Sequence, residues 1–226
     1  MTAVQRQGRT LWRLVGSLVR LSIELGLHHN PYLQKNVFSE EECQLRIRLW
    51  NIVLVHDRGT SILLGRPLAI SPLHANTPQP SRSRSSNDIS EHFVFSAPIA
   101  GLQADVINSL YAPITPEDES SITRKAACVL SLLEEFKRQL PDSYQVYFGG
   151  TADWSREKQV KLVENISEDQ GLTLLKIGIT RILLLRALFN SKELPHPQRE
   201  LALRGGKFIF KVSPHCCIEL YARQLS

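Results

Sequence analysis

Apolar residues recur at steps of three and four over long segments of this chain, and this spacing most constrains its fold. Between residues 10 and 25 the repeat predicts a helix with one apolar side. Gly26 follows directly and predicts a left-handed stop, with Leu27 folding back over the last turn. The apolar positions of this first helix are Leu11, Leu14, Val15, Leu18, Leu21 and Leu25.

A second helix is predicted over about 40–65. Ser39 and Glu42 have the spacing of a capping box, in which each side chain satisfies a free backbone amide at the helix start. Apolar side chains, Trp50 among them, cover most of the circumference of the segment. This coverage is typical of a buried central helix.

The end of this second helix is marked by three consecutive residues. Gly65 predicts a left-handed terminator, and Pro67 prevents the helix from continuing. Arg66 lies where its charge meets the negative end of the helix dipole. The stretch "LGRP" therefore predicts an abrupt turn.

The remainder of the chain also favours helices, so the expected fold class is all-α. Residues 76–92 lack an apolar period and are rich in Ser, Pro and Asn, which predicts a surface loop. The one strand-like stretch, 205–213, has no partner strand. Further helices are predicted from about Pro98, from the start signal at 115–118, around Val160, over 171–190 and from Ser213.

Composition excludes several classes of protein. The net charge of +5 comes from Lys and Arg spread along the chain, which is typical of ordinary surface charge. The four cysteines include no C-x-x-C pair, so neither a disulfide framework nor a zinc site is predicted. The start of the chain shows no signal peptide. Three basic residues interrupt the apolar segment 171–189, which favours a core helix over a membrane span.

No catalytic motif accompanies the candidate reactive residues, so the chain is not expected to be an enzyme. His28 and His29 follow a helix end, where the dipole favours an imidazolium and a capping role suffices. His56 lies on an apolar face, which is typical of a core histidine. The complete set of candidates is His28, His29, His56, Asp57 and His74, and no catalytic, cofactor-binding or metal-binding residue is assigned among them.

Asp57 and Arg58 stand together inside an apolar run. Adjacent residues point about 100° apart on a helix, so these two are not expected to face each other. A buried carboxylate needs a partner, for which Arg20 and Arg66 are the candidates. A charged clamp that locks two helices together is favoured over catalysis.

Two segments resemble the fungal-specific transcription factor domain, also called the middle homology region, of fungal Zn2Cys6 binuclear zinc-cluster regulators. The first is "GRTLWRLVGSLVRLSIELGLHHN", 8–30, and the second is "RIRLWNIVLVHDRGTSILLGRPLAIS", 46–71. A weaker third block comprises "LPDSY", 140–144, and "LKIGITRILLLRALF", 175–189. The residues that carry this structural signature are Arg20, Gly26, His28, Trp50, Asp57, Arg58, Gly65, Arg66 and Pro67.

The resemblance implies a helical regulatory domain, here 8–190, of a nuclear regulator of RNA polymerase II transcription. It implies control through a small-molecule effector or through protein contacts with other regulators or a second copy, and no membrane partner. In the family zinc belongs to a separate six-cysteine cluster, which this chain lacks, so no cofactor and no DNA contact is assigned to these residues. Residues 191–226 match the family poorly, and a truncated chain is expected.

A second interpretation belongs to another class of function. In it the chain is a stand-alone helical interaction protein, or a truncated gene product, that dimerises with or titrates a full-length regulator without binding DNA. The sequence leaves the target genes and the direction of regulation open.

Overall fold

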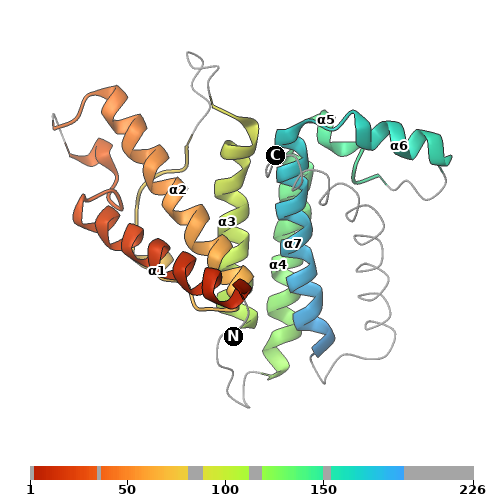
Figure 1. Ribbon diagram of the computed structural model, residues 1–226, viewed down its shortest axis with the longest axis horizontal. Helices are drawn as coiled ribbons and strands as arrows, with labels where there is room; N and C mark the ends of the chain where they lie inside the picture. The colour runs from red at the N-terminus through yellow and green to blue at the C-terminus, as the bar shows by residue number, and fades with distance from the viewer. Residues whose placement is uncertain (1–2, 35–36, 81–88, 112–118, 150–153, 191–226) are drawn as a thin grey trace. The chain divides into compact units, whose positions relative to one another are not determined.

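The described part of the chain is built from helices joined by turns and short extended segments. In the computed structural model these described residues are 3–34, 37–80, 89–111, 119–149 and 154–190. They contain no strand, which confirms the all-α class. The α-helices, coloured by position in Figure 1, are α1 (Ala3–Glu24), α2 (Glu40–Leu64), α3 (Glu91–Leu110), α4 (Glu119–Gln139), α5 (Asp142–Gln145), α6 (Arg156–Glu164) and α7 (Glu168–Asn190).

The chain divides into two compact units, residues 1–107 and 108–226. Helices α1 and α2 belong to the first unit, and α4 to α7 belong to the second. The strand-like stretch 205–213 and the helix expected from Ser213 lie outside the described residues.

Helix α1 ends as its sequence predicts. Gly26 has φ +67°, the left-handed region that glycine adopts without strain. The amide of Gly26 donates to the carbonyl of Ile23 at 2.9 Å, and the amide of Leu27 donates to the carbonyl of Ser22 at 3.0 Å. This is the hydrogen-bond pattern of a Schellman motif. The helix begins at Ala3, however, earlier than the predicted residue 10.

Helix α2 also confirms its predicted signals at both ends. The hydroxyl oxygen of Ser39 accepts from the amide of Glu42 at 3.2 Å, and the amide of Ser39 donates to the Glu42 carboxylate at 2.8 Å. This pair completes the capping box. At the other end Gly65 adopts φ +62°.

Helices α1 and α2 lie side by side and run in opposite directions (Figure 1). Arg46 near the start of α2 reaches the carbonyl of Leu25 at the end of α1. At the other end of the pair, a methyl group on Gly8 would lie 2.9 Å from Leu64, so the helices approach closely there. The shared core contains Val15, Val19, Leu27, Trp50, Val53 and Ile70.

The core uses only part of each apolar surface. On α1, Val15 and Val19 are buried, while four of the leucines on the predicted apolar side are exposed: Leu11, Leu14, Leu21 and Leu25. Helix α2 is likewise not buried all round, because Leu45, Leu49, Ile52 and Leu63 are exposed. Periodicity identified the helices correctly but not which side faces the core.

The expected start of α3 at Pro98 is wrong. The helix begins at Glu91, and the Ser90 hydroxyl accepts from the amide of Phe93 at 3.1 Å as its cap. Pro98 lies inside the helix, where it costs one backbone hydrogen bond. The loop predicted over 76–92 therefore ends before Glu91. Its middle part, 81–88, lies outside the described residues.

In the second unit α4 and α7 pack against each other (Figure 1). Helix α4 buries Ala126, Val129 and Leu133, three of the residues that the sequence placed on its apolar side. Helix α7 buries Thr173, Ile177, Thr180 and Leu184, again at steps of three and four. The short helix expected around Val160 is α6.

Among the described residues, α3 is the helix long and apolar enough to span a membrane by length and composition. Core helices share these properties, so they do not by themselves indicate a membrane segment. The apolar segment 171–189 is part of α7, where Thr173, Ile177, Thr180 and Leu184 are buried.

Two glycines of α2 should respond oppositely to the same substitution. Gly59 lies inside the helix with open space around it, so Gly59→Ala should raise the free energy of unfolding by about 1 kcal/mol. Gly65 has positive φ, so Gly65→Ala should lower it by about 1–2 kcal/mol. Urea unfolding followed by circular dichroism measures both changes, and equal effects of the two substitutions would contradict this assignment of the helix end.

Lys176 provides a pH-dependent prediction. Burial in α7 lowers the pKa of its ammonium group from 10.5 to about 8. Below pH 8 the folded chain therefore holds a half-buried charge that the unfolded chain keeps fully in water. Lys176→Met should raise the melting temperature most below pH 8, and progressively less as the pH rises toward 10.5. The exposed Lys161→Met serves as control, and a gain independent of pH would contradict the assignment.

Candidate functional site

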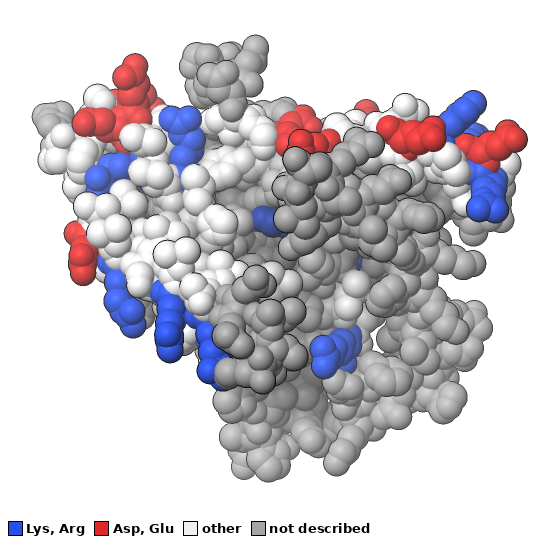
Figure 2. Space-filling view, viewed as in Figure 1, with Lys and Arg blue, Asp and Glu red and all other residues white. Residues whose placement is uncertain are grey.

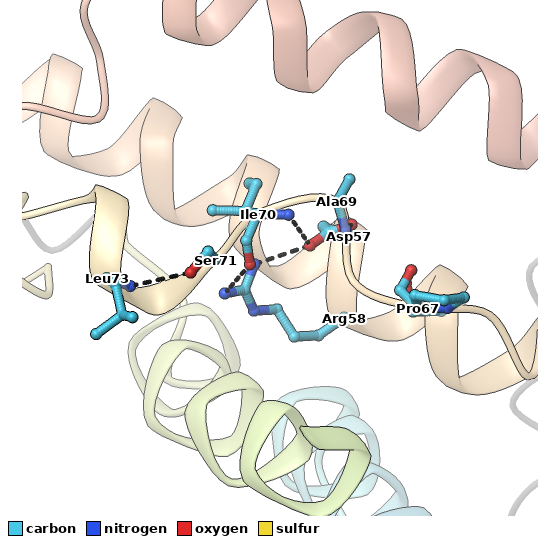
Figure 3. Close-up of polar contacts among 8 residues, drawn as sticks. Asp57, Arg58, Pro67, Ala69, Ile70, Ser71 and Leu73 are labelled. Atoms are coloured by element: carbon cyan, nitrogen blue, oxygen red, sulfur yellow. Dashed lines mark hydrogen bonds and ion pairs between the residues drawn. The ribbon is translucent and has the colours of Figure 1, made fainter. Parts of the chain in front are cut away.

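The carboxylate of Asp57 is the centre of the best-defined polar cluster in the first unit. Asp57 is 2% exposed. One carboxylate oxygen accepts from the amide of Ala69 at 3.0 Å, and the other accepts from the amide of Ile70 at 3.2 Å (Figure 3). Asp57 therefore joins α2 to the chain that follows it. The predicted clamp exists, but it does not lock two helices together.

Arg58 is the charged partner of Asp57, which corrects the expectation that these neighbours do not face each other. Its Nη1 lies 2.9 Å from Asp57 Oδ2, and its Nη2 donates to the carbonyl of Ile70 at 3.3 Å. The long arginine side chain reaches back along the helix surface, so the angle between adjacent Cβ atoms does not limit it. Burial lowers the pKa of Arg58 below its ordinary value, and the opposing effect of the neighbouring Asp57 carboxylate offsets only part of this shift.

Residues 66–78, which we call the return segment, turn back along α2 after Gly65. The amide of Arg66 donates to the carbonyl of Ser61 at 2.9 Å, and the Ser61 hydroxyl donates to the carbonyl of Pro67 at 3.2 Å. The guanidinium of Arg66 lies 4.5 Å above the ring of Trp12 in α1, a cation–π contact that the sequence did not predict.

The far end of the return segment binds the chain beyond α1. The Thr77 hydroxyl donates to the carbonyl of Leu27 at 2.7 Å, and the amide of Asn76 donates to the carbonyl of His28 at 3.1 Å. The buried Asn51 of α2 donates to the carbonyl of Pro78 at 3.1 Å. The two segments that carry the sequence signature are thus tied together by one stretch of backbone.

His28 does not cap α1 as expected. Beside the Schellman motif, the side chain that bonds this helix end is Arg46, whose Nη2 donates to the carbonyl of Leu25 at 2.6 Å. Burial, and then the neighbouring His29, lower the pKa of His28, so the fold favours the neutral ring. The His28 ring lies 3.8 Å from that of His29 and 6.0 Å from that of Trp50.

Trp50 is buried in the structure, whereas Arg20 is exposed. Trp50 is 1% exposed and belongs to the core between α1 and α2. Arg20 is exposed, and no ion pair joins it to Asp57, so the proposed Arg20–Asp57 pairing is wrong. Arg20 and Asp57 instead line the walls of one groove.

This groove, of about 480 Å³, lies between α1, α2 and the start of the return segment. Arg13 and Arg20 contribute its positive charge, and apolar wall surface comes from Trp12 and Ile23. Thr60 also lines it; this residue is 4% exposed, and its hydroxyl makes no hydrogen bond to another described residue. The arrangement can hold a small molecule that combines a negative charge with an apolar part.

The histidine candidates do not assemble with Asp57 into a reactive site. The hydrogen bonds of the Asp57 carboxylate within the described residues go to Arg58, Ala69 and Ile70. In the same part of the chain, no three His, Cys, Asp or Glu side chains come together in a way that can hold a metal ion. Cys216 and Cys217 lie outside it.

Sequence reasoning missed three polar residues that hold the site together. Asn51 was detectable as a polar interruption on an apolar helix. Arg46 and Thr77 had no local signal, because each bonds to a carbonyl more than twenty residues away in sequence.

Removing the Asp57 carboxylate should be strongly destabilising. Asp57→Ala leaves the Arg58 charge buried without its partner, and we expect a loss of about 3–5 kcal/mol in the free energy of unfolding. The double variant Asp57→Ala/Arg58→Met should recover part of the loss, because it removes both charges. Asp142→Ala, at an exposed position, should stay within about 0.5 kcal/mol. Urea unfolding measures all three, and an Asp57→Ala loss as small as that of the control would contradict the clamp.

Comparison with known proteins gives both similar relatives and a family match. Three similar relatives are an uncharacterized transcriptional regulatory protein of Schizosaccharomyces pombe, the equisetin cluster transcription factor of Fusarium heterosporum and the fusarisetin A cluster transcription factor of a Fusarium species. The identities are 29%, 30% and 29%, over 60%, 34% and 34% of this chain. The chain spans only 18%, 11% and 10% of their lengths. No solved structure matches it.

The sequence model of the fungal specific transcription factor domain matches residues 5–143. The match covers more than half of the chain. It includes nearly all of α1, together with α2, the return segment and the Asp57 cluster. The chain therefore belongs to the fungal-specific transcription factor domain family, which is a family of transcription regulators rather than of enzymes.

Proposed function

We propose that this chain is a regulatory domain of a fungal transcription regulator and controls RNA polymerase II transcription from the nucleus. The control would act through an effector bound in the groove between α1 and α2, or through contacts with another protein. Family membership supports the regulatory role, and the groove is the observation that supports an effector site.

The chemistry of the groove favours an organic anion as its ligand. Arg13 and Arg20 carry positive charge, while the negative charge of Asp57 is compensated by Arg58 and two backbone amides. Thr60 and Ser17 add hydroxyl groups to the same walls. A carboxylate or phosphate attached to a small apolar body would match both charge and surface.

Effector binding would act on the fold through the residues that the groove shares with the core. Val15 and Val19 line the groove and also pack in the core between α1 and α2. Asp57 and Ala69, which bond each other, line it as well. A ligand in the groove would therefore stabilise the contact of α1 with α2 and the return segment, by binding the folded form in preference to the open one.

Contact with DNA is proposed to lie outside this sequence. The chain has four cysteines, fewer than the six that a binuclear zinc cluster needs, and it offers no basic block for DNA. Zinc and sequence-specific DNA binding would therefore belong to another segment or another protein.

A reporter assay tests the role of the groove. Gly16 lines the groove with open space around it, so Gly16→Leu should fill the groove without disturbing the helix. Fused to a heterologous DNA-binding domain in a fungal host, the wild-type chain should change reporter transcription, and Gly16→Leu should alter that response. Gly101→Leu, in α3 and equally unobstructed, should behave as wild type. A Gly16→Leu response identical to that of the control would reject the groove as the effector site.

The interaction-protein interpretation is the second candidate, and the exposed leucines of α1 and α2 favour it. In that case the chain acts by pairing with a regulator, and the groove has no ligand. The reporter response would then be insensitive to Gly16→Leu.

A further inference from the structure

Each of the two packed helices of the first unit carries a line of exposed aliphatic residues. On α1 these are Leu11, Leu14, Leu21 and Leu25, which are 42%, 65%, 53% and 57% exposed. On α2 they are Leu45, Leu49, Ile52 and Leu63, which are 50%, 41%, 38% and 72% exposed. We call these eight residues the leucine face.

Both lines lie on the same side of the helix pair. Groove residues such as Gly16 of α1 and Ser61 of α2 mark one side of the α1–α2 contact. By helical periodicity, the exposed line of α1 lies across the contact residues from Gly16. The line of α2 lies across its own contact residues from Ser61 in the same way. The leucine face is therefore the side of the pair opposite to the groove.

The spacing of the leucine face is that of a helical bundle. The four residues of α1, with half-buried Leu18 between them, step by three and four residues along the helix. Leu45, Leu49 and Ile52 of α2 continue through His56 and Gly59 to Leu63 with the same heptad steps. Two antiparallel helices with such lines form one layer of a four-helix bundle.

The distribution of charge on α1 allows the leucine face to contact the same face of a second copy. The exposed arginines of α1, Arg9, Arg13 and Arg20, lie toward the groove side, away from the leucines. In Figure 2 basic side chains gather along the lower edge of α1, while much of the surface over α1 and α2 is uncharged. Two such faces can approach about a twofold axis without bringing the arginines of α1 together.

The size of the face also suits a dimer. A standard interface buries about 800 Å² per partner, and the largest apolar patch of an ordinary monomer is about 300–600 Å². Eight large aliphatic side chains, each between 38% and 72% exposed, supply most of a standard interface before their neighbours are counted.

We propose that the leucine face binds a second copy of this chain, forming a twofold four-helix bundle from α1 and α2 of each protomer. A twofold interface pairs the same surface on both copies, so each apolar line meets an apolar line. Gly59 leaves a gap in the line of α2 that a leucine of the partner can enter. The inference is independent of the effector proposal, because the groove lies on the other side of the helix pair.

Sedimentation of the complete chain over a range of concentrations tests this proposal. The wild type should sediment as a dimer that dissociates on dilution. Leu14→Glu/Leu49→Glu should be monomeric, with Kd raised at least about a hundredfold, because both substitutions bury carboxylates at the centre of the interface. Both positions are exposed in the monomer, so the helical circular dichroism should stay unchanged.

The matched control is Leu73→Glu/Leu132→Glu, which changes two exposed leucines outside the face, 91% and 45% exposed. It should remain dimeric. A monomeric wild type would overturn the proposal and leave the face to a helix of another protein. A dimer that survives Leu14→Glu/Leu49→Glu, or open-ended association in place of a dimer, would also overturn it.

Discussion

The buried carboxylate of Asp57 is the interaction on which the first unit depends. An unpaired charge in this position would cost several kcal/mol, and the fold avoids that cost with one guanidinium and two backbone amides. Those amides belong to Ala69 and Ile70, so satisfying the charge also fixes the path of the chain after α2. Ile70 in turn contributes to the core with Trp50 and Val53. Electrostatics and apolar packing therefore specify the same turn.

This arrangement separates the two sides of the α1–α2 pair. On one side α1, α2 and the start of the return segment form a groove whose walls combine two arginines and hydroxyl groups with apolar surface. On the other side eight aliphatic residues remain exposed. A regulator needs surfaces that can distinguish its partners, and the two sides offer different chemistry: a hollow that combines positive charge with apolar walls on one, and exposed aliphatic side chains on the other.

Local signals in the sequence were enough to predict most of the helices. The Gly26 and Gly65 stops and the Ser39–Glu42 capping box act over a few residues, so their outcome does not depend on distant packing. The start of α3 was missed because Pro98 looked like a first residue, although Ser90 provides the cap.

The details of the site depended on contacts that periodicity does not encode. Whether Arg20, Arg66 or Arg58 pairs with Asp57 is decided by the path of the return segment, and whether His28 or Arg46 caps α1 is decided by how the two helices pack. The exposed side of α1 was unpredictable for a similar reason. Its apolar residues extend over a wider arc than α2 covers, so the pattern alone cannot show which part is left open.

Hydrogen exchange at the amides of Ala69 and Ile70 tests the central role of Asp57 most directly. The Ala69 side chain is exposed and lies outside any helix, so its amide would exchange quickly without a specific acceptor. If the carboxylate holds the return segment, both amides should exchange as slowly as the core amides of α2. Exchange at the rate of an unstructured peptide, while α2 itself remains protected, would contradict the account.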